Sequence, residues 1–115
     1  LRDFIHVCDL AHAHTQALQL LEKEAKQHTC EAINLGSGTG ITVLESIRAF
    51  EKAAGEKLEW TAGPRRPGDV MAIYANNTRA QQRLGWNARF NIDDIMATAW
   101  AWEQRYRKGE TVLSP

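Results

Sequence analysis

The sequence predicts an α+β fold, a small and mostly helical lobe with a few short strands. Apolar residues recur at the three- and four-residue spacing of amphipathic helices in several segments. Short runs of β-forming residues separate them, giving the order strand, helix, strand, helix, strand, loop, helix, helix. The 115 residues suit one compact domain, so residues 1–115 are interpreted as a single lobe.

The first half of the chain is predicted to contain two strands and two helices. The apolar run 4–7 is expected to be a strand, and Asp9 is expected to cap a helix that runs to about Lys26. Residues 32–35 are the second strand candidate. The pattern Thr-Val-Leu-Glu at 42–45 is a capping box, so a second helix should begin there and end at Gly55.

The middle of the chain is predicted to be extended and looped. Residues 58–61 alternate in polarity as an exposed strand does, and residues 63–68 are rich in glycine and proline, which is typical of a loop. Residues 72–75 form either a short strand or a turn. This part of the chain therefore contributes little to the helical core.

Two further helices are predicted near the C-terminal end. Asn77 is expected to cap a short helix that ends at Leu84, before Gly85. Asn91 is expected to cap a longer amphipathic helix that stops at Gly109.

Composition argues against several classes of function. The 14 basic and 14 acidic side chains give a net charge of zero, and no basic stripe indicates a nucleic acid or a membrane surface as partner. No apolar run approaches the roughly 18 residues that span a bilayer. The 2 cysteines are too few for a disulfide framework, so a reducing, cytoplasmic setting is expected.

The loop Gly-Ser-Gly-Thr-Gly at 36–40 follows a predicted strand and precedes a helix, as a phosphate-binding loop would. The spacing argues against a dinucleotide site, because Ile41 stands where the fingerprint needs its third glycine. A plain strand-to-helix turn is the favoured interpretation.

Four potential metal ligands lie within nine residues at the start of the chain: His6, Asp9, His12 and His14. On a helix, His12 and His14 point to different faces, so at most two of the four could converge. No metal site is predicted. The isolated serines lack a nucleophile-elbow context, so no catalytic nucleophile is predicted either.

The segment Pro-Arg-Arg-Pro-Gly-Asp at 64–69 is the strongest candidate site. Two prolines lower the entropy cost of ordering the loop, and the planar fork of arginine suits phosphate oxygens. Asp69 either accepts a ligand hydroxyl or holds the arginines in place, and solvated surface charge is the alternative interpretation of the whole segment. A second Arg-Asp pair, Arg2 and Asp3, adds to what we interpret as an anion-binding site.

Six short motifs occur together along the chain: Arg-Asp-Phe-Ile-His-Val at 2–7, Asp-Leu-Ala at 9–11, Asn-Leu-Gly at 34–36, the segment 64–69, Leu-Gly-Trp at 84–86 and Trp-Ala-Trp at 100–102. In this order and with these gaps they resemble the C-terminal part of UDP-glucose 4-epimerases, which are extended short-chain dehydrogenases/reductases. The resemblance covers essentially the whole chain. It implies the C-terminal substrate domain of such an enzyme, with the Rossmann part absent.

The resemblance implies roles for four residues. Arg2 and Arg66 resemble the two arginines that bind the UDP diphosphate, and Asp69 resembles the carboxylate that holds the ribose hydroxyls. Ile73 resembles a residue lining the sugar pocket, where the family often has tyrosine, cysteine or serine. Branched and apolar, Ile73 offers the hexose no hydrogen bond, and plain UDP-glucose and UDP-galactose are the favoured substrates.

The resemblance also implies what lies outside this chain. In the family, a bound NAD oxidises the sugar at C4 and returns the hydride to the opposite face. The NAD-binding glycine motif, the catalytic serine or threonine and the Tyr-x-x-x-Lys pair would all lie upstream of Leu1. The chain alone is therefore expected to lack catalytic and cofactor-binding residues, and its partners are expected to be a UDP-hexose and the N-terminal Rossmann domain.

Two other interpretations stay open. One is a fragment of a neighbouring nucleotide-sugar epimerase or dehydratase, which shares looser versions of the same motifs. The other is a non-catalytic module that docks a partner through the last helix, which bears Trp100 and Trp102. Core packing is the favoured interpretation of most of the tryptophans, and a wide exposed apolar patch would favour the docking module.

Overall fold

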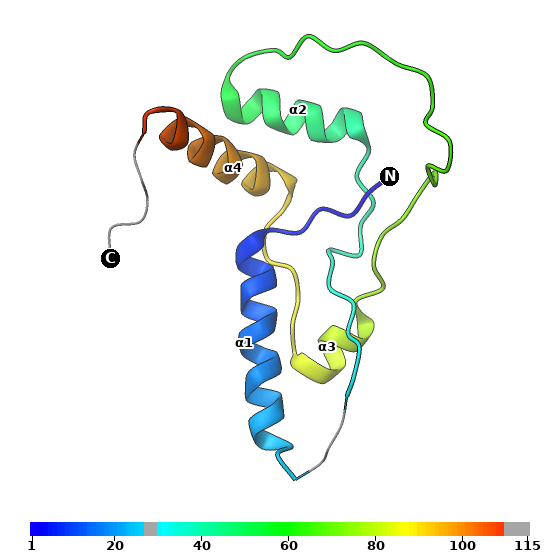
Figure 1. Cartoon of the computed structure of the whole chain (residues 1–115), viewed down its shortest axis with the longest axis vertical. Helices are drawn as coiled ribbons and strands as arrows, with labels where there is room; N and C mark the ends of the chain where they lie inside the picture. The colour runs from blue at the N-terminus through cyan, green and yellow to red at the C-terminus, as the bar shows by residue number, and fades with distance from the viewer. Residues whose placement is uncertain (27–29, 110–115) are drawn as a thin grey trace.

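The computed structural model describes residues 1–26 and 30–109, and this part of the chain is mostly helical (Figure 1). Within it, β-structure is confined to one isolated antiparallel bridge between Arg2 and Ile41. The helices, in chain order, are α1 (Val7–Lys23), α2 (Val43–Ala54), α3 (Thr78–Leu84) and α4 (Ile92–Arg107).

The predicted strands at 4–7, 32–35 and 58–61 are wrong. None of these segments belongs to a ladder within residues 1–26 and 30–109, and Val7 already begins α1. A run of β-forming residues supplies one side of a ladder, but a strand also needs a neighbour that pairs with it over several residues. Among the described residues, the extended segments pair only at the single bridge between Arg2 and Ile41. Residues 72–75 likewise form no strand.

The helices pack as two pairs, α1 with α3 and α2 with α4, and the N-terminal segment lies between the pairs (Figure 1). The radius of gyration is 17.8 Å and the principal extents are 55 × 42 × 23 Å. A compact domain of this length would have a radius of gyration of about 13 Å. The arrangement is therefore open, and long connections rather than a shared core join the two pairs.

The start of α1 differs from the prediction, because His6 and not Asp9 is the N-cap. The His6 ring accepts a hydrogen bond from the backbone N–H of Cys8 at 3.0 Å. Asp9 instead lies fully buried in the first turn and accepts hydrogen bonds from the backbone N–H groups of Arg89 and Phe90, at 3.0 and 3.1 Å. The Asp9 carboxylate is thus bonded to donors far along the chain, and sequence spacing does not reveal such distant partners.

The core of the α1–α3 pair is built from small residues around one tryptophan. Ala13 and Ala80 are buried and let the two helices approach closely, and Trp86 fills the remaining space with none of its surface exposed. The indole N–H of Trp86 donates to the carbonyl oxygen of Asp9 at 2.8 Å. The side chain therefore has both its apolar surface and its one donor satisfied.

The α2–α4 pair begins with two capping boxes. The sequence predicts the first of them, and for α4 it predicts Asn91 as the N-cap without the box. Thr42 with Glu45 caps α2, and Asn91 with Asp94 caps α4, each exchanging side-chain and backbone hydrogen bonds. Phe50 and Trp100 pack edge to face across the pair, with ring centroids 5.4 Å apart.

Glycines end three of the helices where the sequence predicts, whereas α1 ends at Lys23, slightly before the predicted Lys26. Gly55 closes α2 with φ at +72°, Gly85 closes α3 with φ at +62°, and Gly109 lies just beyond α4. Asn77 is the N-cap of α3 without a capping hydrogen bond, because its side-chain oxygen accepts from the Gln81 amide while its own amide donates to the carbonyl oxygen of Gly36. Across residues 1–26 and 30–109, no helix combines the length and the apolar character needed to span a lipid bilayer.

Candidate functional site

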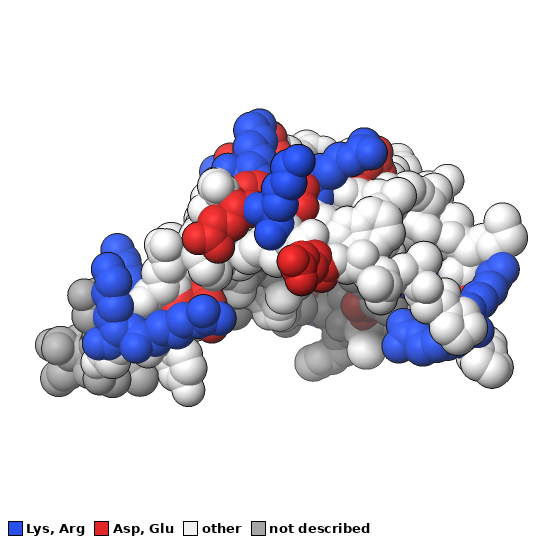
Figure 2. Space-filling view, turned by 90° about the horizontal axis from the view of Figure 1, so that it is seen from above, with Lys and Arg blue, Asp and Glu red and all other residues white. Residues whose placement is uncertain are grey.

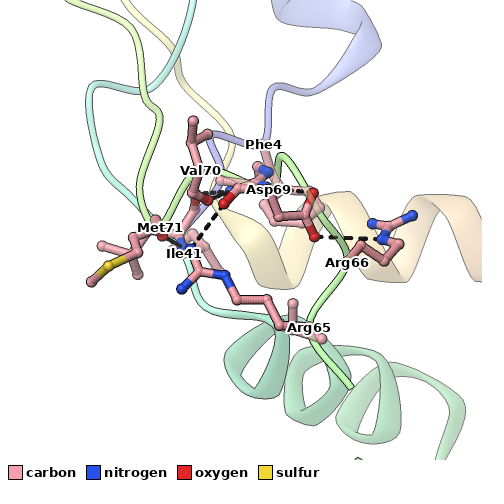
Figure 3. A pocket seen from close by; sticks show the side chains of 10 residues that line it. Phe4, Ile41, Arg65, Arg66, Asp69, Val70 and Met71 are labelled. Atoms are coloured by element: carbon pink, nitrogen blue, oxygen red, sulfur yellow. Dashed lines mark hydrogen bonds and ion pairs between the residues drawn. The ribbon is translucent and has the colours of Figure 1, made fainter. Parts of the chain in front are cut away.

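A cavity of about 450 Å³ lies where the N-terminal segment meets the 64–71 turn and the start of α2 (Figure 3). This volume is in the range of about 300–1,000 Å³ that is typical of ligand pockets. We call it the anion pocket, defined by the residues that line it: Leu1, Arg2, Phe4, Ile41, Val43, Arg65, Arg66, Asp69, Val70 and Met71.

Arg2 reaches the anion pocket from a backbone that two hydrogen bonds hold against Ile41. Its N–H and C=O pair with those of Ile41 at 2.8 Å each. One guanidinium nitrogen, Nη1, donates to the carbonyl oxygen of Val70 at 3.0 Å, and the other, Nη2, lies 3.7 Å from the Asp69 carboxylate. Arg2 thereby connects the N-terminal segment to the 64–71 turn.

The 64–71 turn gathers two more arginines around Asp69. Arg66 Nε lies 3.4 Å from Asp69 Oδ2, and Arg65 donates to the Asp69 carbonyl oxygen at 2.8 Å. Figure 3 shows Arg65 and Arg66 approaching Asp69 from different sides. Gly68 has φ at +83°, a conformation that suits glycine and lets the turn close.

The charge in the anion pocket is locally positive although the chain as a whole is neutral. Three arginines and one aspartate line it, so their charges sum to +2. The side chain of Arg66 is 84% exposed and that of Asp69 38%. Elsewhere, positive and negative side chains are interspersed over the face that Figure 2 shows. The pocket therefore offers an anion several guanidinium donors that need little rearrangement to reach it.

The structure brings Arg2, Arg66 and Asp69 together but leaves Ile73 outside the residues that line the pocket. The Ile73 side chain is 57% exposed, and its backbone N–H donates to the carbonyl oxygen of Leu1 at 3.2 Å. Ile73 therefore lies beside the N-terminal segment that carries Arg2, a short way along the chain from Met71 of the pocket.

Asp3 does not join the anion pocket with Arg2. Its carboxylate accepts hydrogen bonds from Ser37, through both N–H and hydroxyl, and from the backbone N–H groups of Gly38 and Ala75. Partial burial raises the pKa of Asp3, but these hydrogen bonds outweigh it and hold the pKa below its usual value.

The glycine loop 36–40 is unsuited to a phosphate for the same reason. Two of the backbone N–H groups that a phosphate would need, those of Ser37 and Gly38, already donate to the Asp3 carboxylate. Gly36 is required by close packing, since an added Cβ would lie 2.6 Å from the Cβ of Ala75 and closer still to Asp3. The loop serves as a packed turn.

Two of the three histidines considered as metal ligands have other partners, whereas the buried Nδ1 of His12 has none among the described residues. His6 Nε2 lies 2.9 Å from the Thr98 hydroxyl, and His14 Nδ1 lies 2.8 Å from the carbonyl oxygen of Leu10. Within the described ranges 1–26 and 30–109, no group of three or more histidine, cysteine or acidic side chains is placed to hold a metal ion.

The four tryptophans divide between core and surface. Trp86 is fully buried, which confirms core packing for it, and the half-buried Trp100 packs edge to face on Phe50. Trp60 and Trp102 are 53% and 55% exposed. Trp102 lines a mostly apolar groove between α4 and the start of α1, with Ile5, His6, Val7, Cys8, Ile95, Thr98 and Ala99. The last helix therefore does expose apolar surface, and no contact in the described chain covers it.

Sequence reasoning missed the apolar half of the anion pocket. Phe4, Ile41, Val70 and Met71 line it beside the arginines. The positions of Phe4 and Arg2, two residues apart on an extended segment, are a signal that the sequence does contain. Ile41 gives no such signal, because it reaches the pocket only through its pairing with Arg2.

Comparison with protein families and with known proteins gives a consistent result. The family model described as GDP-mannose 4,6 dehydratase matches residues 1–99. UDP-glucose 4-epimerase uge1 of Schizosaccharomyces pombe is 47% identical over 111 residues, which are 95% of this chain and 30% of that protein. UDP-glucose 4-epimerase of Homo sapiens is 43% identical over 108 residues, 94% of this chain and 30% of that protein.

Solved structures agree with the sequence relatives. The crystal structure of UDP-glucose 4-epimerase from Bifidobacterium longum in complex with NAD⁺ and UDP superposes with a TM-score of 0.78 at 40% identity, over 93% of this chain and 31% of that one. A second UDP-glucose 4-epimerase structure gives a TM-score of 0.82 at 33% identity, over 92% and 32%. The chain thus spans about 30% of the length of the relatives it matches.

Proposed function

Since the chain belongs to the family described as GDP-mannose 4,6 dehydratase, we propose that it is the UDP-sugar-binding, C-terminal part of a UDP-glucose 4-epimerase. The parent enzyme would interconvert UDP-galactose and UDP-glucose. Identities of 43% and 47% to named UDP-glucose 4-epimerases over more than nine-tenths of the chain favour this activity over that of another nucleotide-sugar enzyme. They also count against a non-catalytic docking module, despite the exposed groove beside Trp102.

One observation supports the binding role above all: the convergence of Arg2, Arg66 and Asp69 at a single pocket. Both guanidiniums lie within 4 Å of the same carboxylate, at 3.7 and 3.4 Å. Two forks so close together can grip adjacent phosphate groups of a diphosphate. The pocket carries an excess of two positive charges, which complements such a ligand.

We assign the ligand contacts by the donors and acceptors that each side chain offers. Arg2 and Arg66 would donate to the diphosphate oxygens, and Asp69 would accept from the ribose hydroxyls. In the structure Asp69 also holds both arginines, so the two roles that the sequence left open are compatible. A carboxylate has acceptor sites for both sets of donors.

Ile73 is proposed as a contact of the hexose. It lies beyond the diphosphate residues along the chain and exposes an apolar side chain next to the segment 1–4. It would contact a sugar only through its apolar surface, which suits plain hexoses and gives no hydrogen bond to discriminate between them.

The chemistry itself is proposed to depend on parts of the parent protein other than these residues. NAD, when bound, supplies the hydride acceptor and donor. The glycine loop 36–40 does not fit this cofactor, because its amides are bonded to Asp3. A Rossmann domain of the parent would hold NAD, and this chain would bind and orient the nucleotide. Both cysteines are free thiols, which is compatible with a cytoplasmic enzyme.

The proposal is tested on the complete gene product that contains this chain. With NAD present, it should convert UDP-galactose to UDP-glucose. Arg66→Ala should raise the KM for UDP-galactose by about tenfold or more, since one charge-assisted hydrogen bond to phosphate is worth roughly 1.5–3 kcal/mol. Arg105→Ala, an arginine on α4 outside the pocket, is the matched control and should change nothing.

Two outcomes would contradict the proposal. One is a protein that folds and binds NAD but acts on a GDP-sugar rather than a UDP-sugar. The other is an active epimerase whose KM is the same with Arg66 or alanine at this position, which would mean that the anion pocket does not bind the substrate.

A further inference from the structure

We propose that Asp3 is a positioning residue of the anion pocket: its carboxylate fixes the extended segment 1–4 so that Arg2 stays directed at the ligand. The inference rests on the proposed function, because it names a residue that acts on UDP binding without touching UDP. Asp3 itself is absent from the lining of the pocket.

The Asp3 carboxylate accepts four hydrogen bonds from two separate segments. Ser37 donates through its backbone N–H at 2.9 Å and its hydroxyl at 2.6 Å, Gly38 N–H donates at 3.3 Å, and Ala75 N–H donates at 3.0 Å. Three of the four donors are backbone groups, so these hydrogen bonds hold the backbone of segment 1–4 against the backbone of the two other segments. Such a fully bonded carboxylate is strongly oriented.

These two segments lead directly into the walls of the anion pocket. Residues 36–38 lead to Ile41, which pairs with Arg2, and Ala75 follows the stretch that contains Val70 and Met71. Asp3 therefore ties together the three parts of the chain that form the pocket, at a point immediately behind it.

The alternation of an extended chain explains how Asp3 controls Arg2. Arg2 and Phe4 both line the pocket, and Asp3 between them faces the opposite side and bonds to Ser37 and Ala75. Since alternate side chains point to opposite faces, fixing Asp3 fixes the direction of its two neighbours. A slip of one residue in this segment would turn Arg2 away from the ligand.

Asparagine at this position would keep the shape but not the hydrogen bonds. It has one acceptor oxygen and one amide group that donates, so its amide would face backbone N–H donors that need acceptors. Asp3→Asn should therefore loosen the segment while conserving its volume. Ser37→Ala removes one of the four donors to Asp3, together with the two bonds between this hydroxyl and the Thr39 backbone, and should act in the same direction more weakly.

A double-mutant cycle on UDP binding tests the inference, with the complete gene product titrated calorimetrically. Asp3→Asn should weaken UDP binding about fivefold in the wild-type background, and by less than about twofold when Arg2 is already alanine, because coupled residues are not additive. Ser37→Ala should weaken it by about twofold and serves as the readout if Asp3→Asn does not fold. Asp93→Asn, the same exchange on α4 away from the pocket, should leave the affinity unchanged.

The outcomes separate this inference from the proposed function. If the wild-type protein does not bind UDP, both are overturned. If it does, and Asp3→Asn and Ser37→Ala leave the affinity unchanged, the positioning role alone is overturned. Equal losses with and without Arg2 would also overturn it, since they would show a general structural role that does not act through Arg2.

Discussion

Residues 1–9 connect two regions, the anion pocket at residues 1–4 and the junction of α1 with α3 at Asp9, and these two regions differ in how far they are buried. At the junction, Asp9 and Trp86 are fully buried, and the hydrogen bond between the Trp86 indole and the Asp9 carbonyl oxygen is buried with them. In the pocket, the Arg66 side chain is 84% exposed and its ion pair with Asp69 is open to water. We therefore expect stability to depend on the junction, and the proposed ligand binding to depend on the pocket.

The contrast is clearest between two aspartates that both lie near arginines. Asp9 is buried, bonds two backbone N–H groups and has Arg89 Nε at 3.9 Å. Asp69 holds its arginines by ion pairs that are exposed, and such pairs contribute about 0–1 kcal/mol to stability. The same residue types thus fix the fold in one place and leave donors available to a ligand in the other.

The largest expected effect comes from Trp86→Ala at the junction. Deleting a buried tryptophan costs about 3–5 kcal/mol of unfolding free energy, and it also removes the indole N–H that donates to the Asp9 carbonyl oxygen. Urea denaturation followed by far-UV circular dichroism would measure the loss. Trp60→Ala, at a tryptophan that is largely exposed, should change the unfolding free energy by less than about 0.5 kcal/mol. Equal losses at the two positions would contradict the assignment of the core.

The next effect sharpens the comparison of the two aspartates. Asp9→Ala leaves the N–H groups of Arg89 and Phe90 unbonded, which should cost about 2 kcal/mol or more. Asp69→Ala should change the unfolding free energy by less than about 0.5 kcal/mol but weaken UDP binding. Thermal denaturation and UDP titration on both variants would test the contrast, which fails if Asp69→Ala destabilises the protein as much as Asp9→Ala.

A smaller effect is expected at the helix start beside the pocket. Thr42→Ala removes the side chain that accepts from the N–H of Glu45 at 3.1 Å, and it should cost about 1 kcal/mol. Asn91→Ala, at the second capping box, should cost a similar amount and provides the matched comparison. Chemical denaturation would measure the loss of unfolding free energy in both variants. A clearly larger loss for Thr42→Ala than for Asn91→Ala would contradict the expectation that the two caps contribute equally.

The smallest predicted effect is a dependence of stability on pH that comes from Asp3. Hydrogen bonds hold the pKa of Asp3 in the folded state below its usual value. The ionised carboxylate therefore stabilises the folded protein fully at a pH above the usual pKa, and this stabilisation is lost as the pH falls from the usual pKa through the folded-state pKa. Unfolding midpoints of the wild type and of Asp3→Asn should therefore converge as the pH is lowered from 7 through about 4 toward the folded-state pKa. A constant difference between them over this range would contradict the assignment.

Local sequence signals predicted the helices because the interactions that start and stop them are local. Thr42, Asn91 and Gly55 act within four residues of themselves, so both helix starts and the helix-ending glycine were found where expected. The same reasoning failed for Asp9, whose partners lie about 80 residues away at Arg89 and Phe90. Its short polar side chain looked like a cap because nothing nearby reveals a distant donor.

The candidate site shows the same limit. The turn that holds Arg66 and Asp69 was predictable because its prolines, glycine and charges are contiguous. Arg2 joins this turn because its backbone pairs with Ile41. Asp3 faces Ser37 and Ala75 instead, and this depends on contacts with two other segments that the local sequence does not reveal. The predicted strands failed for a related reason, since pairing partners cannot be read from one segment.

The measurement that tests the central claim most directly is calorimetric titration of UDP and of uridine into the complete gene product and its Arg66→Ala variant. If the arginines bind the diphosphate, the wild type should prefer UDP to uridine by about tenfold or more, since that preference needs only about 1.4 kcal/mol from the phosphates. Arg66→Ala should remove most of it and leave uridine binding unchanged. A preference that survives this substitution intact would contradict the claim that Arg66 binds the diphosphate in the anion pocket.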